Sequence, residues 1–326
     1  MSFDANAHRE ASLHGWEEAA PGWVRRQAMV REFGAPVAAW MIDAIAPQPG
    51  QRVLELAAGL GETGMLTAEL LAPGGVAIIS DQAEGMLAAA RERAAAIGLD
   101  NVEFAVLNAE WIDLPVASVD AVVCRWGYML MADPAAALAE TRRVLRAGGR
   151  LALAVWDAIE RNPWARLPAL ELMERGLTTP VANRAPGPFA LGDGEQLLEL
   201  LRRAGFAEAR VEGIDLLRRH ACFEEFWSST LDLSRVFHDA VLARPATEIA
   251  DIEASLAARF APYMRAGGTL EIPARTLVAA ARSRAAVSIA SAWSEMIATP
   301  PGVSSSAVSM PVSPRPAASS STRWPG

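Results

Sequence analysis

The chain has 326 residues, of which 52% are hydrophobic and 21% are charged, a composition typical of a globular protein. Its length fits one large domain or two modest ones, at roughly 100–200 residues per domain. Every basic side chain other than histidine is an arginine, and the formal net charge is −8. Nucleic acids and anionic membranes are disfavoured as partners, because binding phosphate requires a basic surface.

The two cysteines and the amino terminus bear on the compartment. Cys124 and Cys222 are far apart and form neither a paired metal motif nor a disulfide framework. The first sixteen residues carry scattered charges rather than the apolar core of a signal peptide. No apolar run approaches the roughly 18 residues that a membrane span requires. These features predict a soluble cytoplasmic protein with no metal and no membrane span.

The central part of the chain alternates β-rich runs with alanine-rich stretches. Strands are predicted at 52–57, 76–80, 102–107, 119–124 and 150–156, and helices at 64–71, 84–97 and 134–145. Repeated strand–helix units indicate a mainly parallel sheet with helices on both faces. Residues 46–157 are therefore predicted to form a doubly wound, Rossmann-like α/β core.

Further segments flank this core. Residues 1–45 are predicted as a helical cap, which is either a packing layer or a lid over a ligand. A cap insertion at 158–190 precedes a core helix and strand at 191–218, a second helical insertion at 219–268 and a last strand at 269–286, which gives a mostly parallel seven-stranded sheet. Both insertions are expected beyond the carboxyl ends of the strands, where open α/β folds bind ligands.

The tail at 287–326 has a different composition. Serine and proline dominate its ending and no apolar period is present. Such a segment cannot bury enough surface to order itself, so disorder is predicted. Its abrupt onset also leaves open a read-through or frameshifted end that is not native.

A glycine-rich loop follows the first predicted strand. The stretch "VLELAAGLGETG" contains the Gly-x-Gly-x-x-Gly fingerprint of dinucleotide-binding proteins, so an NAD-dependent oxidoreductase is one interpretation. However, Glu55 lies within the preceding strand, and a buried carboxylate is costly unless it is paired. A cationic ligand such as the sulfonium and ammonium of S-adenosylmethionine fits this carboxylate better than a pyrophosphate does.

The stretch from 53 to 157 resembles class I S-adenosylmethionine-dependent methyltransferases, in the branch of the ubiquinone/menaquinone-type C-methyltransferases and their small-molecule relatives. In the family's acidic-x-Gly-x-Gly-x-Gly loop, Glu55 matches the acidic residue, and Gly59 and Gly61 match the second and third glycines. Ala57 replaces the first glycine. It must therefore keep a negative φ or bear backbone strain.

The resemblance also implies cofactor contacts after the later strands. Asp81, which ends the second strand, would accept both ribose hydroxyls, although it could also begin a helix in a capping-box-like arrangement. Gln82 would lie against the adenine. In "LNAEWIDLP", the segment of Asn108 and Ala109 would hold the adenine amino group, or Asn108 would simply shape a turn. Arg125 would contact the methionine carboxylate.

The acceptor side has no comparable motif. Trp126 and Tyr128 either face the substrate or merely pack, and Trp16 and Trp156 are further candidates. The aromatic content of the caps predicts a hydrophobic or aromatic acceptor in a site closed from water; the residues concerned are Trp16, Trp23, Trp156, Trp164, Phe226 and Trp227.

Methyl transfer is an in-line displacement that needs alignment rather than a metal. A base is needed only if the acceptor must lose a proton. The candidates are His14, His220, His238 and Tyr128, and none is assigned. The sequence thus predicts C- or O-methylation of a small molecule, with an NAD-dependent oxidoreductase or a non-catalytic S-adenosylmethionine-binding protein as alternatives.

Overall fold

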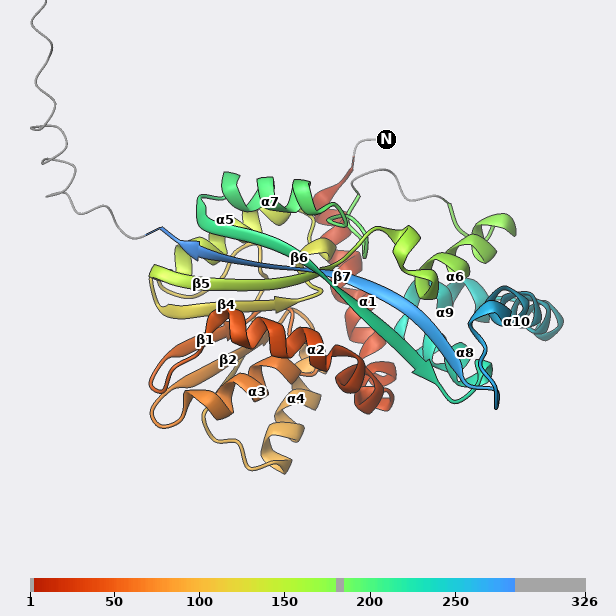
Figure 1. Ribbon diagram of the computed structural model, residues 1–326, viewed down its shortest axis with the longest axis horizontal. Helices are drawn as coiled ribbons and strands as arrows, with labels where there is room; N and C mark the ends of the chain where they lie inside the picture. Colours follow the sequence, from red (N-terminus) through yellow and green to blue (C-terminus); the bar gives the residue numbers. More distant parts are fainter. Residues whose placement is uncertain (1–2, 180–184, 285–326) are drawn as a thin grey trace, which may run out of the picture. The chain divides into compact units, whose positions relative to one another are not determined.

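The computed structural model describes residues 3–179 and 185–284. Within them the chain forms a seven-stranded sheet of order β3-β2-β1-β4-β5-β7-β6 (Figure 1). The strands are β1 (Arg52–Glu55), β2 (Val76–Asp81), β3 (Val102–Val106), β4 (Val119–Arg125), β5 (Leu145–Trp156), β6 (Phe206–His220) and β7 (Leu270–Ser283). The first five strands are parallel, and β7 is antiparallel to both of its neighbours. The predicted doubly wound, mostly parallel α/β fold is confirmed. The predicted tail lies outside the described residues.

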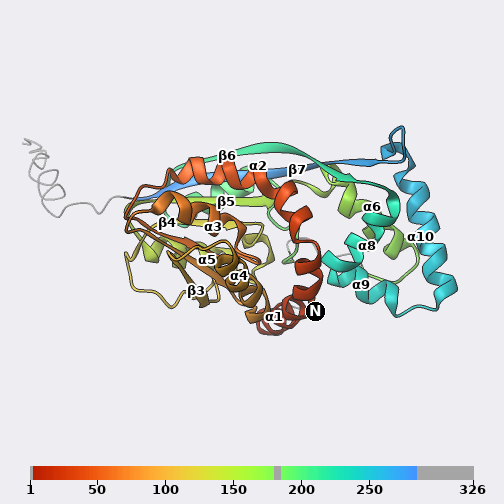
Figure 2. The same cartoon turned by 90° about the horizontal axis from the view of Figure 1, so that it is seen from below.

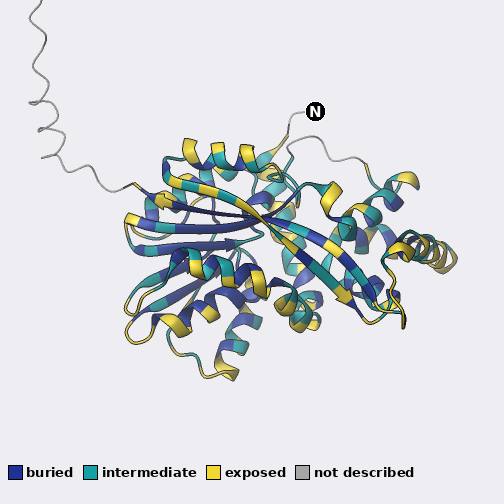
Figure 3. Ribbon diagram, in the orientation of Figure 1, coloured by how far each residue is buried: buried dark blue, intermediate teal, exposed yellow. Residues whose placement is uncertain are grey.

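Helices cover both faces of this sheet. On one face lie α2 (Gln27–Ile45), α3 (Glu62–Leu71) and α4 (Glu84–Ala96), which contact strands from β3 across to β7. On the other face lie α5 (Pro134–Val144) and α7 (Gly194–Arg203). The sheet is therefore buried on both sides, as parallel sheets generally are. Figure 3 shows that the central strands are the most buried part of the sheet and its covering helices.

The central strands are apolar because both of their faces are covered. Val122 and Val123 of β4 are fully buried, as is Leu54 of β1. From α2, Val37 and Met41 complete the same core with no exposed surface. Of the two interpretations of the amino-terminal cap, a packing layer describes α2.

The remaining helices lie beyond the carboxyl ends of the parallel strands. They are α1 (Ala5–Arg25), α6 (Pro163–Glu174), α8 (Phe223–Leu233), α9 (Arg235–Leu242) and α10 (Ala246–Phe260), with short 3-10 turns at Tyr128–Leu130, Ile159–Arg161 and Ala261–Tyr263. In Figure 2, α1 lies between the sheet and the pair α8 and α9. The long strands β6 and β7 remain paired with each other and extend past the other strands, toward α6, α8, α9 and α10.

We refer to α6, α8, α9 and α10, together with the outer ends of β6 and β7, as the cap. The cap has a hydrophobic cluster of its own, in which Phe226 and Phe260 are fully buried with ring centroids 4.4 Å apart. It is joined to α1 by a close approach, because a Cβ on Gly22 would lie 2.2 Å from the carbonyl oxygen of Asp232. Arg25 and Arg26 both pair with Asp232. These contacts fix α1 against α8.

Several boundaries differ from the sequence-based expectations. Strand β1 ends at Glu55 rather than at residue 57, because the chain turns into the glycine loop. Strand β5 begins at Leu145, so the glycine pair expected to end a helix lies within the strand, beside a register shift against β4. His220, expected in the second helical insertion, is the last residue of β6, because its pairing with β7 extends to Leu270.

The described residues hold neither a helix suited to a membrane nor a cluster suited to a metal. No helix there is long and apolar enough to cross a membrane. No group of three or more histidine, cysteine, aspartate or glutamate side chains within the described ranges could hold a metal ion.

Candidate active site

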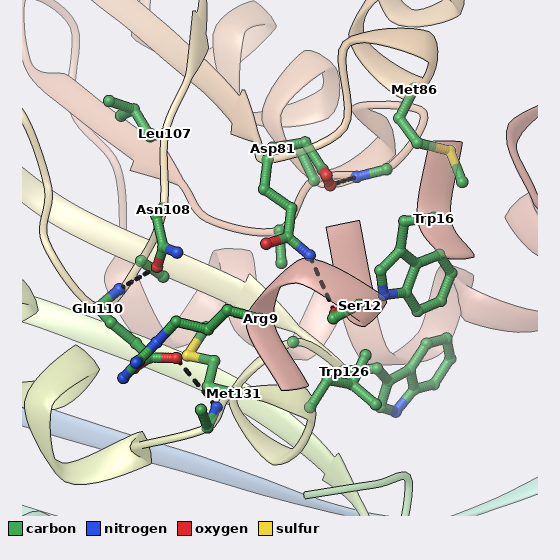
Figure 4. Close-up of a pocket in the computed structure, with 18 of the residues that line it drawn as sticks. Arg9, Ser12, Trp16, Asp81, Met86, Leu107, Asn108, Glu110, Trp126 and Met131 are labelled. Atoms are coloured by element: carbon green, nitrogen blue, oxygen red, sulfur yellow. Dashed lines mark hydrogen bonds and ion pairs between the residues drawn. The ribbon is translucent and has the colours of Figure 1, made fainter. Parts of the chain in front are cut away.

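A cavity lies where the turns after β1, β2, β3 and β4 meet α1 (Figure 4). Carboxyl ends of parallel strands lie at one edge of a sheet, so these turns converge although they are distant in sequence. We call this the first cavity; from the core it is lined by Ala57, Ala58, Gly59, Asp81, Gln82, Met86, Leu107, Asn108, Ala109, Glu110, Arg125, Trp126, Gly127, Leu130, Met131 and Ala132.

The glycine loop has the strain that the sequence left as one of two possibilities. Ala57 has a φ of +48°, in the left-handed region that disfavours a side chain. Its methyl group is accommodated by Gly127, where a Cβ would lie only 2.6 Å from the Cβ of Ala57. Gly59 lines the cavity, whereas Gly61 does not. Gly61 precedes α3 with a φ of +74° and is packed close to Met65, Ile79 and Ala90.

Glu55 lies beneath the loop and does not line the cavity. Its Oε2 accepts a hydrogen bond of 2.7 Å from the backbone N–H of Gly64, in the first turn of α3. Burial raises the pKa of Glu55 to about 7, and the nearby Arg125 opposes that rise. Arg125 is thus the nearby cation of the chain that partly offsets the burial of Glu55. In dinucleotide sites, the N–H groups at this helix start bind the pyrophosphate; here one of them is bound by a carboxylate.

Arg125 ends β4 and lies between Glu55 and the cavity. Its Nε donates to Thr63 Oγ1 at 3.3 Å, and its guanidinium carbon lies 4.9 Å from the ring centroid of Trp126. Its Nη1 is buried and has no hydrogen-bond partner among the described residues. Burial lowers the pKa of Arg125. Gly34 of α2 leaves room for this group, since a Cβ there would lie 2.0 Å from Nη1.

Asp81 ends β2 and organises two turns. Its Oδ2 accepts from Gly59 N at 2.8 Å and its Oδ1 from Ala83 N at 2.9 Å. Burial raises the pKa of Asp81, and these backbone bonds oppose that shift. The capping box suggested by Glu84 is not formed, because Ala83 is the N-cap and Glu84 pairs with Arg91 at the surface. Each carboxylate oxygen retains capacity for a further hydrogen bond from a ligand.

Gln82 and Asn108 also have partners within the protein. Gln82 Nε2 donates to Ser12 Oγ of α1 at 3.1 Å. Asn108 Oδ1 accepts from Glu110 N at 2.8 Å, which is the turn-forming arrangement that the sequence left open. Both side chains line the first cavity, as does Ala109.

Helix α1 closes the cavity with Trp16 and Trp23, which the sequence analysis named, and with His8, Arg9 and Ser12, which it missed. Figure 4 shows Arg9, Ser12 and Trp16 facing the core residues from this helix. Arg9 binds the buried Glu110 at 2.5 and 3.0 Å, and His8 Nε2 lies 3.0 Å from the carbonyl oxygen of Leu130. The enclosed volume is about 130 Å³. Helix α1 therefore lies over the first cavity, and its role as a lid over a ligand stays a prediction.

The missed residues share a sequence pattern with Trp16 and Trp23. Positions 8, 12 and 16 are spaced by four residues, and 9, 16 and 23 by seven, so they share one helix face. That face mixes polar and aromatic side chains, and a search for apolar periodicity alone passes over it.

A second cavity of about 830 Å³ lies between α1, α2 and the cap. It shares four lining residues with the first cavity: Trp16, Trp23, Trp126 and Leu130. Stacked aromatic rings form one wall, with Trp126 and Trp156 4.4 Å apart at 13° and Phe33 about 6 Å from each. Trp164 packs edge-on against Trp156.

Some of the residues predicted to bind the acceptor or to act as a base line a cavity, and others do not. Trp16, Trp126 and Trp156 line the second cavity, as does His220. Tyr128 lines neither cavity: it is fully buried, its hydroxyl lies 2.5 Å from Thr141 Oγ1, and burial raises its pKa. It therefore fits neither the substrate role nor that of a base.

The other candidates lie elsewhere. His14 is largely exposed beside Glu18, and His238 is placed against the carbonyl oxygen of Leu231; neither lines the first or the second cavity. Phe226 and Trp227 belong to the hydrophobic cluster of the cap rather than to a cavity wall.

Known proteins resemble this chain in sequence and fold. The sequence model of a protein family described as "methyltransferase domain" matches residues 56–153. A demethylmenaquinone methyltransferase of Clavibacter sepedonicus is 34% identical over 184 residues, covering 50% of this chain and 69% of the relative. A nocamycin O-methyltransferase of Saccharothrix syringae is 29% identical over 223 residues, covering 64% and 79%. The crystal structure of YcgJ of Bacillus subtilis shares the fold, with a TM-score of 0.53, 18% identity, and coverage of 76% of this chain and 97% of that one.

The first cavity fits S-adenosylmethionine chemically. A buried carboxylate, Asp81, suits ribose hydroxyls, and Arg125 brings a positive charge to the cavity wall, which suits a carboxylate. A dinucleotide pyrophosphate fits poorly, since Glu55 binds the N–H at the start of α3. The oxidoreductase alternative is therefore overturned, and the chain belongs to the S-adenosylmethionine-dependent methyltransferases of the ubiquinone/menaquinone and small-molecule type.

Proposed function

We propose that this methyltransferase methylates a small hydrophobic, aromatic acceptor bound in the second cavity. The observation that carries the proposal is the sharing of Trp16, Trp23, Trp126 and Leu130 by the two cavities. A donor in the first cavity and an acceptor in the second would meet at these residues. Stacked aromatic walls favour a flat apolar acceptor.

The cofactor contacts in this proposal follow the residues that line the first cavity. Asp81 binds the ribose hydroxyls, while Gln82, Asn108 and Ala109 surround the adenine. Arg125 binds the methionine carboxylate, and the backbone at Ala57 and Gly59 allows close approach of the cofactor. When bound, S-adenosylmethionine supplies a methyl group that is already activated by its sulfonium.

The protein's own contribution is then to align the acceptor and to exclude water. Helix α1 covers the cofactor side, and the rings of Trp126 and Trp156 orient the acceptor. No residue is assigned as a base. The names of the relatives include both C- and O-methyltransferases, so the acceptor's carbon and oxygen atoms are both proposed targets.

The test uses S-adenosylmethionine labelled in its methyl group. Hydroxylated naphthoquinones and polycyclic phenols are compared with small polar amines and acids. We expect label only in products of the aromatic acceptors. Labelling of the polar acceptors alone, or binding of S-adenosylhomocysteine with no turnover of any aromatic acceptor, would contradict the proposal.

A pair of variants tests whether the acceptor binds in the second cavity. Replacing Trp156 by alanine should raise the acceptor's KM at least tenfold and leave the affinity for S-adenosylhomocysteine within about twofold. Trp40→Ala is the matched control, because Trp40 lies on α2, is half-buried against the core and lines neither cavity. Equal effects of the two variants would remove the second cavity from the proposal.

A further inference from the structure

We infer that the acceptor carries an anionic oxygen group, which Arg218 binds by an ion pair while the imidazole of His220 hydrogen-bonds to the acceptor beside it. This inference rests on the proposed function, since it concerns the same second cavity. It adds a polar anchor to a site whose other walls are largely aromatic.

Arg218 is a cation without an acidic partner. It lines the second cavity from β6, with its guanidinium carbon 4.8 Å from the ring centroid of Trp164 and 5.5 Å from that of Phe33. It makes no ion pair and no side-chain hydrogen bond with any other residue of the described ranges. Burial lowers its pKa to about 10, still far above neutral pH, so the guanidinium stays charged.

The acidic residues around this cavity bind elsewhere. Glu271 pairs with Arg219, Asp215 pairs with Arg275, and Glu225 accepts the backbone N–H of Ala221. Glu32, the other carboxylate in the lining, is exposed on α2. Burial of this cation costs free energy, and the attraction of the aromatic faces offsets only part of that cost unless an anion joins it. The position of Arg218 therefore suits an anion supplied by a ligand.

His220 is an independent sign of a ligand. It lines the same cavity, its exposed fraction is 3%, and neither Nδ1 nor Nε2 has a hydrogen-bond partner among the described residues. Its ring packs edge-on against Phe226, with centroids 5.4 Å apart. Buried polar atoms in native proteins nearly always have partners. Two unpartnered ring nitrogens at a cavity wall thus point to a polar group that arrives from outside.

The two side chains have complementary roles. They are two residues apart on β6 and so lie on one face of the strand. Burial, with Arg218 and Arg26 nearby, lowers the pKa of His220 to about 3, so its ring is neutral at physiological pH. A neutral imidazole offers one donor and one acceptor. It can donate to an oxygen that Arg218 binds, or accept from a neighbouring hydroxyl.

The chemistry fits an aromatic body bearing a carboxylate or an ionised hydroxyl. The rings of Phe33, Trp156 and Trp164 contact the body, and Arg218 binds the charged oxygen. Among acceptors of equal size, the charged ones should bind more tightly than their neutral counterparts.

The test is calorimetric, using the full chain saturated with S-adenosylhomocysteine. Three probes are compared at pH 7.5: 2-naphthoate as the carboxylate, 2,4-dinitro-1-naphtholate as the ionised hydroxyl, and 2-naphthamide as the neutral body. We expect at least one anion to bind tenfold or more tightly than the amide. Which anion gains affinity distinguishes the two sources of charge.

Variants assign this preference to the proposed residues. Arg218→Gln should abolish it, whereas Arg210→Gln should retain it, because Arg210 is an exposed arginine of the same strand that lines neither cavity. His220→Leu should weaken anion binding severalfold, and His220→Gln, which keeps a donor and an acceptor, should restore most of it. Unchanged affinity for S-adenosylhomocysteine shows that each variant is folded.

The outcomes separate this inference from the proposed function. Equal binding of the amide and both anions would overturn the inference while leaving an aromatic acceptor cavity in place. A preference for anions that persists in Arg218→Gln would also overturn it. Failure of all three probes to bind the wild-type protein would contradict both proposals.

Discussion

The first cavity is built by the core, and the second largely by α1, α2 and the cap. In the core, the lining residues follow successive strands, and backbone hydrogen bonds such as those to Asp81 fix them. In the second cavity, the walls come from distant segments, such as Phe33 of α2, Trp156 of β5 and Arg218 of β6. The difference teaches that the first cavity depends on strand order, whereas the second cavity depends on how helices pack beyond the sheet.

The most disruptive test separates the stability of the cap from that of the core. Phe260→Ala removes a fully buried ring from the cap's cluster and should lower the free energy of unfolding by about 3–5 kcal/mol. Urea denaturation followed by tryptophan fluorescence measures this loss. Val236→Ala, an exposed position on α9, is the control and should change it by less than about 0.5 kcal/mol.

The affinity of Phe260→Ala for S-adenosylhomocysteine sharpens the comparison. If the cap is an independent element, calorimetry under native conditions should give an affinity within twofold of wild type. A parallel loss of cofactor affinity would show that cap and core stabilise each other as one cooperative unit.

The second prediction concerns pH and Glu55, in the core. Its folded pKa of about 7 exceeds its ordinary value of 4.5. The unfolded chain therefore releases this proton first, and the free energy of unfolding falls as the pH rises from about 4.5 to 7. Glu55→Gln, which can still accept from Gly64 N, should gain about 2–3 kcal/mol relative to wild type between pH 5 and pH 8.

Urea denaturation at the two pH values, without cofactor, measures this gain. Glu103→Gln, at an exposed position on β3, should show no such change. A difference between Glu55→Gln and wild type that does not vary with pH would mean that Arg125 keeps Glu55 ionised throughout.

The third prediction tests the proposed donor site. Asp81→Ala should weaken S-adenosylhomocysteine binding by roughly 1.5–3 kcal/mol, the scale for hydrogen bonds to a charged group. Titration calorimetry gives the affinity, and thermal denaturation shows whether the variant is folded. Glu84→Ala removes a nearby surface carboxylate and should bind normally. Unchanged affinity in folded Asp81→Ala would reject the ribose contact.

The smallest expected effect concerns the lid. Arg9→Ala breaks the ion pair with the buried Glu110 that ties α1 to the core. Dissociation of S-adenosylhomocysteine, followed by stopped-flow tryptophan fluorescence, should accelerate roughly fivefold, since this loss is on the order of 1 kcal/mol. Arg31→Ala removes the same charge from an exposed site on α2. If both variants release the ligand at the wild-type rate, this ion pair does not hold α1 over the cofactor.

Much of the core could be predicted from sequence because its patterns are local. Each strand is an apolar run followed by a turn, and parallel order brings the turns together, so Asp81, Asn108 and Arg125 were predicted on the same cavity that they line. The roles of Glu55 and Gly61 were harder to predict. The side chain of Glu55 points to the start of α3, where it accepts a hydrogen bond from Gly64 N. Gly61 is packed against Met65, Ile79 and Ala90. Neither residue lines the first cavity.

The acceptor side could be predicted only in its character. Aromatic content predicted a hydrophobic or aromatic acceptor, and Trp16, Trp126 and Trp156 do line the second cavity, where acceptor binding is our proposal. Tyr128 has the same kind of sequence context as Trp126, yet its chain turns into a 3-10 segment that buries the ring against α5. Nothing in the local sequence distinguishes these two directions.

The sequence by itself determined the alternation of strands and helices, the glycine loop and the order of the turns, because these depend on local periodicity and on residues close in the chain. Only the tertiary structure decided that α1 covers the first cavity, that Arg125 lies near Glu55, and that Arg218 and His220 share a cavity with Trp156. These contacts join segments far apart in sequence. They depend on long-range packing, which no local pattern encodes.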